Sequence, residues 1–130
     1  MDNSFLPLRD KSFLNGKGFS YREVNDGAQK GIVIDNFPVY PQGKFTADTV
    51  SLLILLPIGY PDIAPDMFYT IPTLRFIQTN TLPAQADYMF SSFGTIWQRW
   101  SRHSTPDAWR PGIDGLQSYL QRVLTALNAA

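Results

Sequence analysis

The stretch VSLLILLPI, residues 50–58, is the most apolar segment of the chain and decides what kind of fold is possible. It is about half as long as a helix that crosses a bilayer, and Pro57 and Gly59 end it. An uninterrupted apolar run of this length is typical of a strand buried in a sheet. The chain is therefore expected to fold around a β-sheet.

Two further strands are predicted before this run. FSYREV and KGIVIDNF flank the segment NDGAQ, in which Asn25, Asp26 and Gly27 tolerate the positive φ angles of a tight hairpin turn. The turn is expected to be exposed. Residues 38–46 form a loop, because Pro38 and Pro41 cannot donate hydrogen bonds to a sheet. The three strands together predict an antiparallel meander.

Helices are predicted at both ends. LPLRDKSFLNGKG is typical of a short helix that is closed by Gly16 or Gly18. In PGIDGLQSYLQRVLTALNAA, from residue 111 to residue 130, apolar residues recur at steps of three and four, which indicates one apolar helical face. The members of this face are Ile113, Leu116, Leu120, Val123, Leu124 and Leu127.

The region between the third strand and the final helix is rich in proline. Its apolar runs DMFYTI and TLRFI predict one edge strand within a long loop. No internal repeat and no linker is visible, so residues 1–130 are expected to form one domain. The order of elements predicts the α+β class, with the helices packed on one side of an antiparallel sheet.

The composition narrows the possible functions. Eleven basic residues balance eleven acidic ones, which argues against binding to nucleic acid or to an anionic membrane. There is no cysteine, which excludes disulfides and thiolate chemistry, and a single histidine with scattered carboxylates predicts no metal site. We expect no cofactor. The first residues, with Asp2 and no long apolar run, are unlike a secretory signal, so a cytoplasmic protein is expected.

One segment concentrates the residues that could carry a function. WQRWSRHSTPDAWRPG, residues 97–112, holds three tryptophans, three arginines and the only histidine. Three interpretations of this segment are open: a reaction centre, a binding surface or a well-packed corner. Interleaved tryptophan and arginine can also bind single-stranded nucleic acid, but the zero net charge disfavours this interpretation.

Two short motifs point to a known fold. Y-P-x-x-x-P at Tyr60 to Pro65, and W-x-P at Trp109 to Pro111 before a terminal helix, resemble the landmarks of ubiquitin-conjugating enzymes. More narrowly, DMFY, WQRWSRH and WRPGIDGL are similar to the prokaryotic ubiquitin-conjugating family E. The resemblance implies a fold with an N-terminal helix, a meander of three to four strands and a C-terminal helix packed on one side. It also implies antiphage defence, with a ubiquitin-like protein, an activating enzyme and a protein substrate as partners.

The resemblance places the active site at Ser101. In the family, the catalytic cysteine lies eight residues before the tryptophan of W-x-P, and counting back from Trp109 gives Ser101. This serine is either natural or a replacement of cysteine. The chain departs from the family in other ways: it lacks His-Pro-Asn, Asp66 stands where a second proline is usual, and residues 72–90 look like an insertion.

A serine acceptor would form an oxyester and would need a base. His103 is the candidate, because histidine titrates near neutral pH and lies on the same face as Ser101 if the segment is extended. Ser104 and Thr105 are alternative acceptors. The residues expected to stabilise an oxyanion or to bind the carrier are Gln98, Arg99 and Arg102. Those expected to be structural are Trp97, Trp100, Trp109 and Pro111.

Two functions remain open at this stage. The chain is a conjugating enzyme that accepts a ubiquitin-like protein on Ser101 and passes it to an amine, or it is a non-catalytic module of the same fold. In the second case it binds the carrier or the activating enzyme through a surface of tryptophan and arginine, and His103 is only a packed surface residue. The missing His-Pro-Asn favours the module, and the position of Ser101 favours the enzyme.

Overall fold

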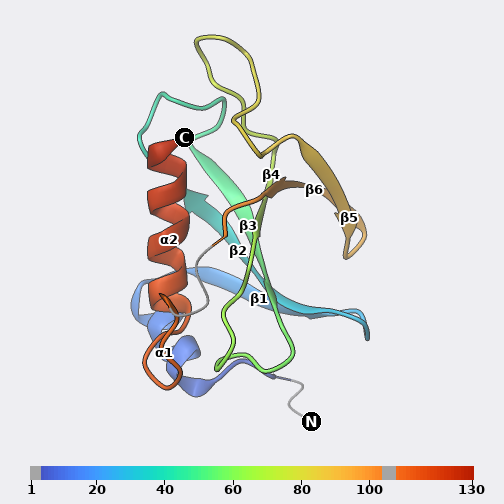
Figure 1. The fold of residues 1–130 in the computed structure, drawn as a ribbon, viewed down its shortest axis with the longest axis vertical. Coiled ribbons are helices and arrows are strands. Elements are labelled where there is room, and N and C mark those ends of the chain that lie inside the picture. The colour runs from blue at the N-terminus through green and yellow to red at the C-terminus, as the bar shows by residue number, and fades with distance from the viewer. Residues whose placement is uncertain (1–3, 104–107) are drawn as a thin grey trace.

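The computed structural model describes residues 4–103 and 108–130 and shows an antiparallel sheet flanked by two helices (Figure 1). This arrangement confirms the predicted α+β class. The elements in chain order are α1 (Leu8–Gly16), β1 (Ser20–Asn25), β2 (Lys30–Pro38), β3 (Thr49–Leu56), β4 (Phe68–Ile71), β5 (Tyr88–Ser92), β6 (Thr95–Trp100) and α2 (Leu116–Ala129).

The sheet contains the predicted meander and extends beyond it. The strand order is β1-β2-β3-β4-β6-β5, and every neighbouring pair is antiparallel. Strands β1 to β3 are the expected meander, and the turn at Asn25, Asp26 and Gly27 is exposed as predicted. The sheet has six strands where three to four were predicted. Strand β4 is not an edge strand, because β6 pairs with its free side.

The two additional strands form a hairpin that the sequence pattern did not reveal. Its two-residue turn, Phe93 and Gly94, has φ angles of 51° and 75°. Positive φ at both central residues is the signature of a type I′ turn, whose usual sequence is Asn-Gly or Asp-Gly. Phenylalanine rarely adopts this conformation, so FG is a weak signal for a turn.

The central strands are buried on both faces, which explains why β3 is apolar without alternation. On the face toward the helices, Ile34 of β2 and Leu52 of β3 join the main core. On the opposite face, Val33 and Leu53 form a second cluster with Tyr69 and Trp97. The second cluster is closed by side chains of β4, β5 and β6.

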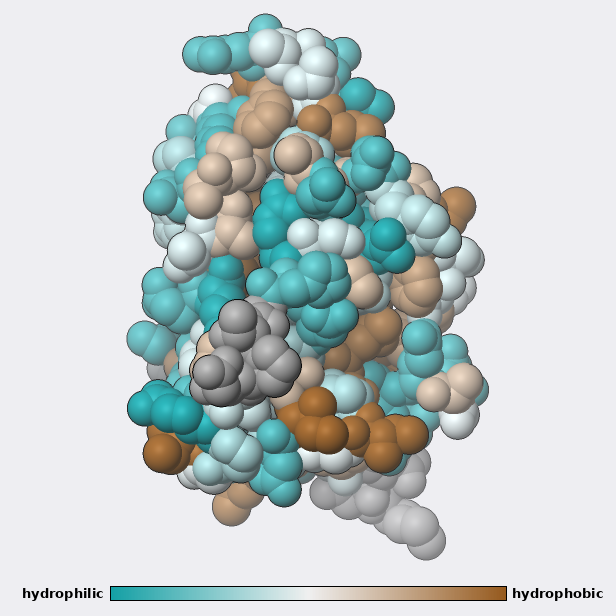
Figure 2. All heavy atoms as spheres, in the orientation of Figure 1, coloured by the Kyte–Doolittle hydropathy of each residue, from teal (hydrophilic) through white to brown (hydrophobic). Residues whose placement is uncertain are grey.

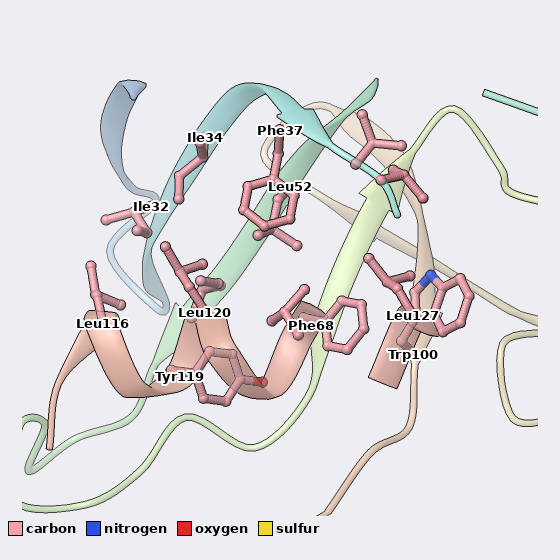
Figure 3. Packing of buried hydrophobic residues seen from close by; sticks show 14 of the residues in the cluster. Ile32, Ile34, Phe37, Leu52, Phe68, Trp100, Leu116, Tyr119, Leu120 and Leu127 are labelled. Atoms are coloured by element: carbon pink, nitrogen blue, oxygen red, sulfur yellow. The ribbon is translucent and has the colours of Figure 1, made fainter. Parts of the chain in front are cut away.

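Helix α2 lies along one face of the sheet and supplies most of the helical contacts to the core. Figure 3 shows Leu116, Leu120 and Leu127 on the side of α2 that faces the sheet, with Leu127 beside Trp100. The predicted apolar face is therefore confirmed for these leucines. Ile113 was wrongly included: it precedes α2 and is 56% exposed, because the chain turns at Gly112 and the helix begins only at Leu116.

A buried carboxylate joins α1 to the rest of the molecule. Asp10 is fully buried and accepts hydrogen bonds from the Tyr60 hydroxyl at 2.6 Å and from the Leu116 amide at 3.0 Å. A negative charge at the first amide of α2 also complements the helix dipole. Gly115 leaves room for this contact, since a Cβ there would lie 2.8 Å from Asp10 Oδ1.

The segment between β4 and β5 packs on the loop between β2 and β3. Phe76 bridges to Phe45 and stacks on its ring at 5.5 Å, and the Thr46 amide donates to the Arg75 carbonyl. Leu74 is fully buried. Within the described part of the chain, no helix combines the length and the hydropathy needed to cross a bilayer.

Candidate functional site

Strand β6 distributes the candidate residues between the two faces of the sheet. Successive side chains of a strand point to opposite faces, so Trp97 and Arg99 share one face while Gln98 and Trp100 share the other. Ser101 directly follows β6 and, by the same alternation, lies on the face of Trp97 and Arg99. The sequence WQRWS thus places its indoles in two separate hydrophobic clusters.

The tryptophans lie inside the protein. Trp100 is fully buried, stacks on Phe68 at 5.6 Å and donates from Nε1 to the Thr70 hydroxyl. Trp97, only 3% exposed, donates to the Ser92 carbonyl in the second cluster. Trp109 is 7% exposed. These indoles are not available to a partner, so a binding surface built on tryptophan is excluded.

Gln98 is the centre of a buried polar cluster. Its side-chain oxygen accepts from the Leu74 amide at 2.7 Å and from the Thr70 hydroxyl at 3.0 Å. Its side-chain nitrogen donates to the carbonyls of Leu74 and Ala86. The side chain is 1% exposed, so the structure places it where it fastens the loop after β4 to β6.

Ser101 has a fixed backbone and a weakly held hydroxyl. Its amide donates to the Gln85 carbonyl at 2.9 Å, and its carbonyl accepts from Arg102 Nη1 at 3.0 Å. The hydroxyl donates to the thioether of Met67 at 3.4 Å. A thioether is a weak acceptor, so little energy opposes rotation of this hydroxyl toward another partner.

His103 forms a close pair with Asp66. His103 Nδ1 lies 2.7 Å from Asp66 Oδ1, and both side chains are more than half exposed. If Nδ1 carries the proton and donates to the carboxylate, Nε2 is left as a free acceptor. Ser101 and His103 are two positions apart, but among the described contacts no hydrogen bond joins them.

The two arginines beside Ser101 differ in their environments. Arg102 donates from Nη2 to the Ala84 carbonyl at 2.9 Å and lies over the Trp100 ring, and partial burial lowers the pKa of its guanidinium. Arg99 lies over the Tyr88 ring at 4.0 Å. Its Nε is buried without a hydrogen-bond partner in the described structure.

The W-x-P motif forms a folded corner next to this segment. Trp109 Nε1 donates to the Pro61 carbonyl at 2.9 Å, and Pro111 is exposed in the turn that follows. Asp114 closes the turn by accepting from the Arg110 side chain and amide, and these hydrogen bonds lower the Asp114 pKa to about 2. The corner therefore ties the two sequence motifs together.

Comparison with known proteins identifies the family. The family model described as prokaryotic E2 family E matches residues 6–130. The chain belongs to prokaryotic E2 family E. No curated protein and no solved structure matches it significantly.

Within this ubiquitin-conjugating-like family, Asp66 is the site residue that sequence reasoning missed. It was noted only as a departure, because it stands where the Y-P motif usually has a second proline. The partner of His103 could have been sought among the carboxylates near the motif, but only the fold shows which one is adjacent. Ser104 and Thr105 lie outside the described residues, and no three metal-ligating side chains cluster in the part of the chain that is described.

The Asp66–His103 pair contributes to two hollows of this family member, His103 to one lining and Asp66 to the other. One, of about 430 Å³, lies against the second half of α2 and is lined by Arg102, His103 and Tyr119 among others. The other, of about 710 Å³, is lined by the turn between β1 and β2 and by Asp66 and Met67 among others. Figure 2 shows one face of the molecule, on which hydrophobic side chains concentrate near the lower rim. The loop between β3 and β4 carries the exposed Ile58 and Ile63.

Proposed function

We propose that this protein accepts the C-terminal acyl group of a ubiquitin-like protein on Ser101 as an oxyester and transfers it to an amine of a protein substrate. The Asp66–His103 pair, at 2.7 Å and two residues from the family's acceptor position, carries the proposal. A serine nucleophile needs a base, and a carboxylate that orients the imidazole is the usual arrangement for one.

The proposed reaction has two steps. In the first, His103 Nε2 removes the Ser101 proton, the serine oxygen attacks the carrier's thioester carbonyl, and the thiol of the activating enzyme leaves with a proton. In the second, a substrate amine attacks the oxyester, an amide forms, and the serine oxygen regains a proton. The exposed His103 side chain and the rotatable hydroxyl of Ser101 must approach each other for the first step.

Arg99 lies on the same side of the strand as Ser101, whereas the Gln98 amide is used inside the protein. Because the Arg99 Nε is buried, this side chain must move away from the Tyr88 ring to reach the carrier. A donor aimed at the carbonyl oxygen would stabilise the charge that develops there. Arg102 holds the Ser101 and Ala84 carbonyls and therefore orients the acceptor segment.

The decisive experiment is an incubation with the cognate activating enzyme, the carrier and ATP. The expected adduct resists thiol reductants, is cleaved by hydroxide or hydroxylamine, and is absent from Ser101→Ala. In Ser101→Cys the adduct becomes a thioester, so the same reductants now release it. An undiminished adduct in Ser101→Ala contradicts the assignment of the acceptor.

The base is tested separately with substitutions at exposed positions. His103→Ala should slow adduct formation on the order of 10²- to 10⁴-fold, and Asp66→Asn should slow it by at least about tenfold. Asp62→Asn, an exposed carboxylate of the same loop, is the matched control and should leave the rate unchanged. A fall of only about twofold in His103→Ala would leave the imidazole without a role as base.

The second candidate function is a non-catalytic module that binds the carrier or the activating enzyme. The absence of a described hydrogen bond between Ser101 and His103, together with the cysteine-free sequence, favours it. A tight complex without any covalent adduct would support this alternative. In either case we propose that the protein works in the cytoplasm, in a conjugation pathway that serves antiphage defence.

A further inference from the structure

The two edges of the sheet differ in how well they are protected. Edge strand β1 carries the charged residues Arg22 and Glu23, and Glu23 binds the amides of Phe5 and Leu6 from the N-terminal segment. Edge strand β5 has the sequence YMFSS, without a charge or a proline, and it lies at the outer side of the sheet (Figure 1). Charges and covering segments are the usual protection of an edge against pairing, and β5 has neither.

The hairpin turn determines which backbone groups of β5 face outward. In a two-residue hairpin the residues that flank the turn, Ser92 and Thr95, form a hydrogen-bonded pair, and the pairs then alternate along the ladder. Phe90 and Tyr88 therefore bond to β6. Met89 and Ser91 direct their amides and carbonyls to the open edge, where the described residues offer no partner.

The side chains around this edge are apolar and exposed. Met89 is 42% exposed, Tyr88 is 51% exposed, and Ile96 of the neighbouring strand is 62% exposed. Met89 and Ile96 lie on the face that the helices cover elsewhere, but α2 does not extend over the hairpin. Exposed apolar residues beside unpaired backbone groups are typical of a strand that pairs with another chain.

We propose that two copies of this chain associate through antiparallel pairing of their β5 strands. The register that centres the two-fold axis on Phe90 pairs Met89 with Ser91 of the second copy, and Ser91 with Met89 of the second copy. This register forms four hydrogen bonds and satisfies the outward amide and carbonyl of both residues in each copy. The two sheets then continue as one.

Three features of this pairing favour a second copy as the occupant. The register is self-complementary, as a two-fold interface requires. Phe90, which contacts the Tyr69 ring at 4.9 Å, meets Phe90 of the second copy in a non-hydrogen-bonded pair, where side chains approach most closely. The net charge of the chain is zero, so two copies do not repel each other.

Sedimentation of the purified chain over about 5 to 500 µM tests the proposal, because small interfaces associate in this range. The apparent mass should rise from 14.7 kDa toward twice this value. Ser91→Pro removes an outward amide without touching the ladder to β6, and it should weaken association about tenfold or more. Ser91→Ala keeps the amide and is the matched control, with unchanged association.

A second variant and a second measurement guard against misfolding of the proline variant. Met89→Lys should also weaken association. Ile58→Lys should not, because Ile58 is 99% exposed and lies in the loop between β3 and β4, outside β5. Amide exchange should slow with concentration at Met89 and Ser91 only. A monomer at every concentration, or a dimer that Ser91→Pro and Met89→Lys leave intact, would overturn the proposal.

Discussion

Gln98 was predicted to face a ligand, and it instead organises the interior. Both atoms of its side-chain amide bond to protein groups, so its environment is determined by the loop after β4, which is distant in sequence. A glutamine between an indole and a guanidinium gives no sequence signal for this role. Alternation along β6 would have separated it from Ser101, but β6 itself was not predicted.

The structure predicts a large loss of stability when the Gln98 amide is removed. Gln98→Leu keeps the volume but leaves the Leu74 amide and the carbonyls of Leu74 and Ala86 buried without partners. We expect a decrease of about 3 kcal/mol or more in the free energy of unfolding, measured by urea denaturation. Gln121→Leu, on the exposed side of α2, is the control and should change stability by less than about 0.5 kcal/mol. Equal effects of the two substitutions would contradict the buried cluster.

At the scale of elements, regular hydrophobic patterns were sufficient to predict helices and strands, whereas a turn of unusual sequence hid the second hairpin. The three- and four-residue spacing in the final segment predicted α2, and FSYREV and KGIVIDNF on either side of NDGAQ predicted the first hairpin. The second hairpin was missed because Phe93 occupies a position that normally needs glycine or asparagine. The spacing also extended the helix pattern to Ile113, because periodicity alone does not show where Gly112 turns the chain.

A pair of substitutions tests where the apolar face of α2 begins. Leu120 is 4% exposed in the main core, so Leu120→Ala should reduce the free energy of unfolding by about 2 to 5 kcal/mol. Ile113→Ala, outside the helix and 56% exposed, should reduce it by less than about 0.5 kcal/mol. Thermal melts of both variants measure the difference. A comparable cost at both positions would restore Ile113 to the core.

At the scale of the whole molecule, the two sequence motifs that carried the family resemblance meet in space. The Tyr60 and Trp109 rings lie 6.5 Å apart, and Trp109 also binds the Pro61 carbonyl. Asp10 adds α1 to the same junction. The family's acceptor position, Ser101, could be found by counting back from Trp109, but the residues that surround it could not be predicted from the sequence. Asp66 and Met67 reach Ser101 and His103 only through the pairing of β4 with β6.

The junction predicts energetic coupling between Asp10 and Tyr60. Asp10→Asn and Tyr60→Phe each weaken the 2.6 Å hydrogen bond that connects α1 to the loop between β3 and β4. In a double-mutant cycle the two substitutions should be non-additive by about 1 to 2 kcal/mol, measured by urea denaturation. The matched control cycle pairs Asp10→Asn with Tyr40→Phe, a half-exposed tyrosine elsewhere, and should be additive. Additivity of the first pair would show that the two residues do not act together.

The same contact gives the stability a dependence on alkaline pH. Burial, and then the hydrogen bond and charge of Asp10, raise the pKa of Tyr60 well above its usual value of about 10. A group whose pKa is raised on folding stabilises the protein below its unfolded pKa, and this contribution is lost as the pH rises. The wild-type chain should therefore lose stability above about pH 10, and Tyr60→Phe should lose less over the same range. Denaturation at pH values on both sides of this point measures the two slopes. Identical slopes would mean that folding does not raise the Tyr60 pKa, and the attachment of α1 would then rest on the Leu116 amide and the Arg9 contacts to Gly112 and Asp114.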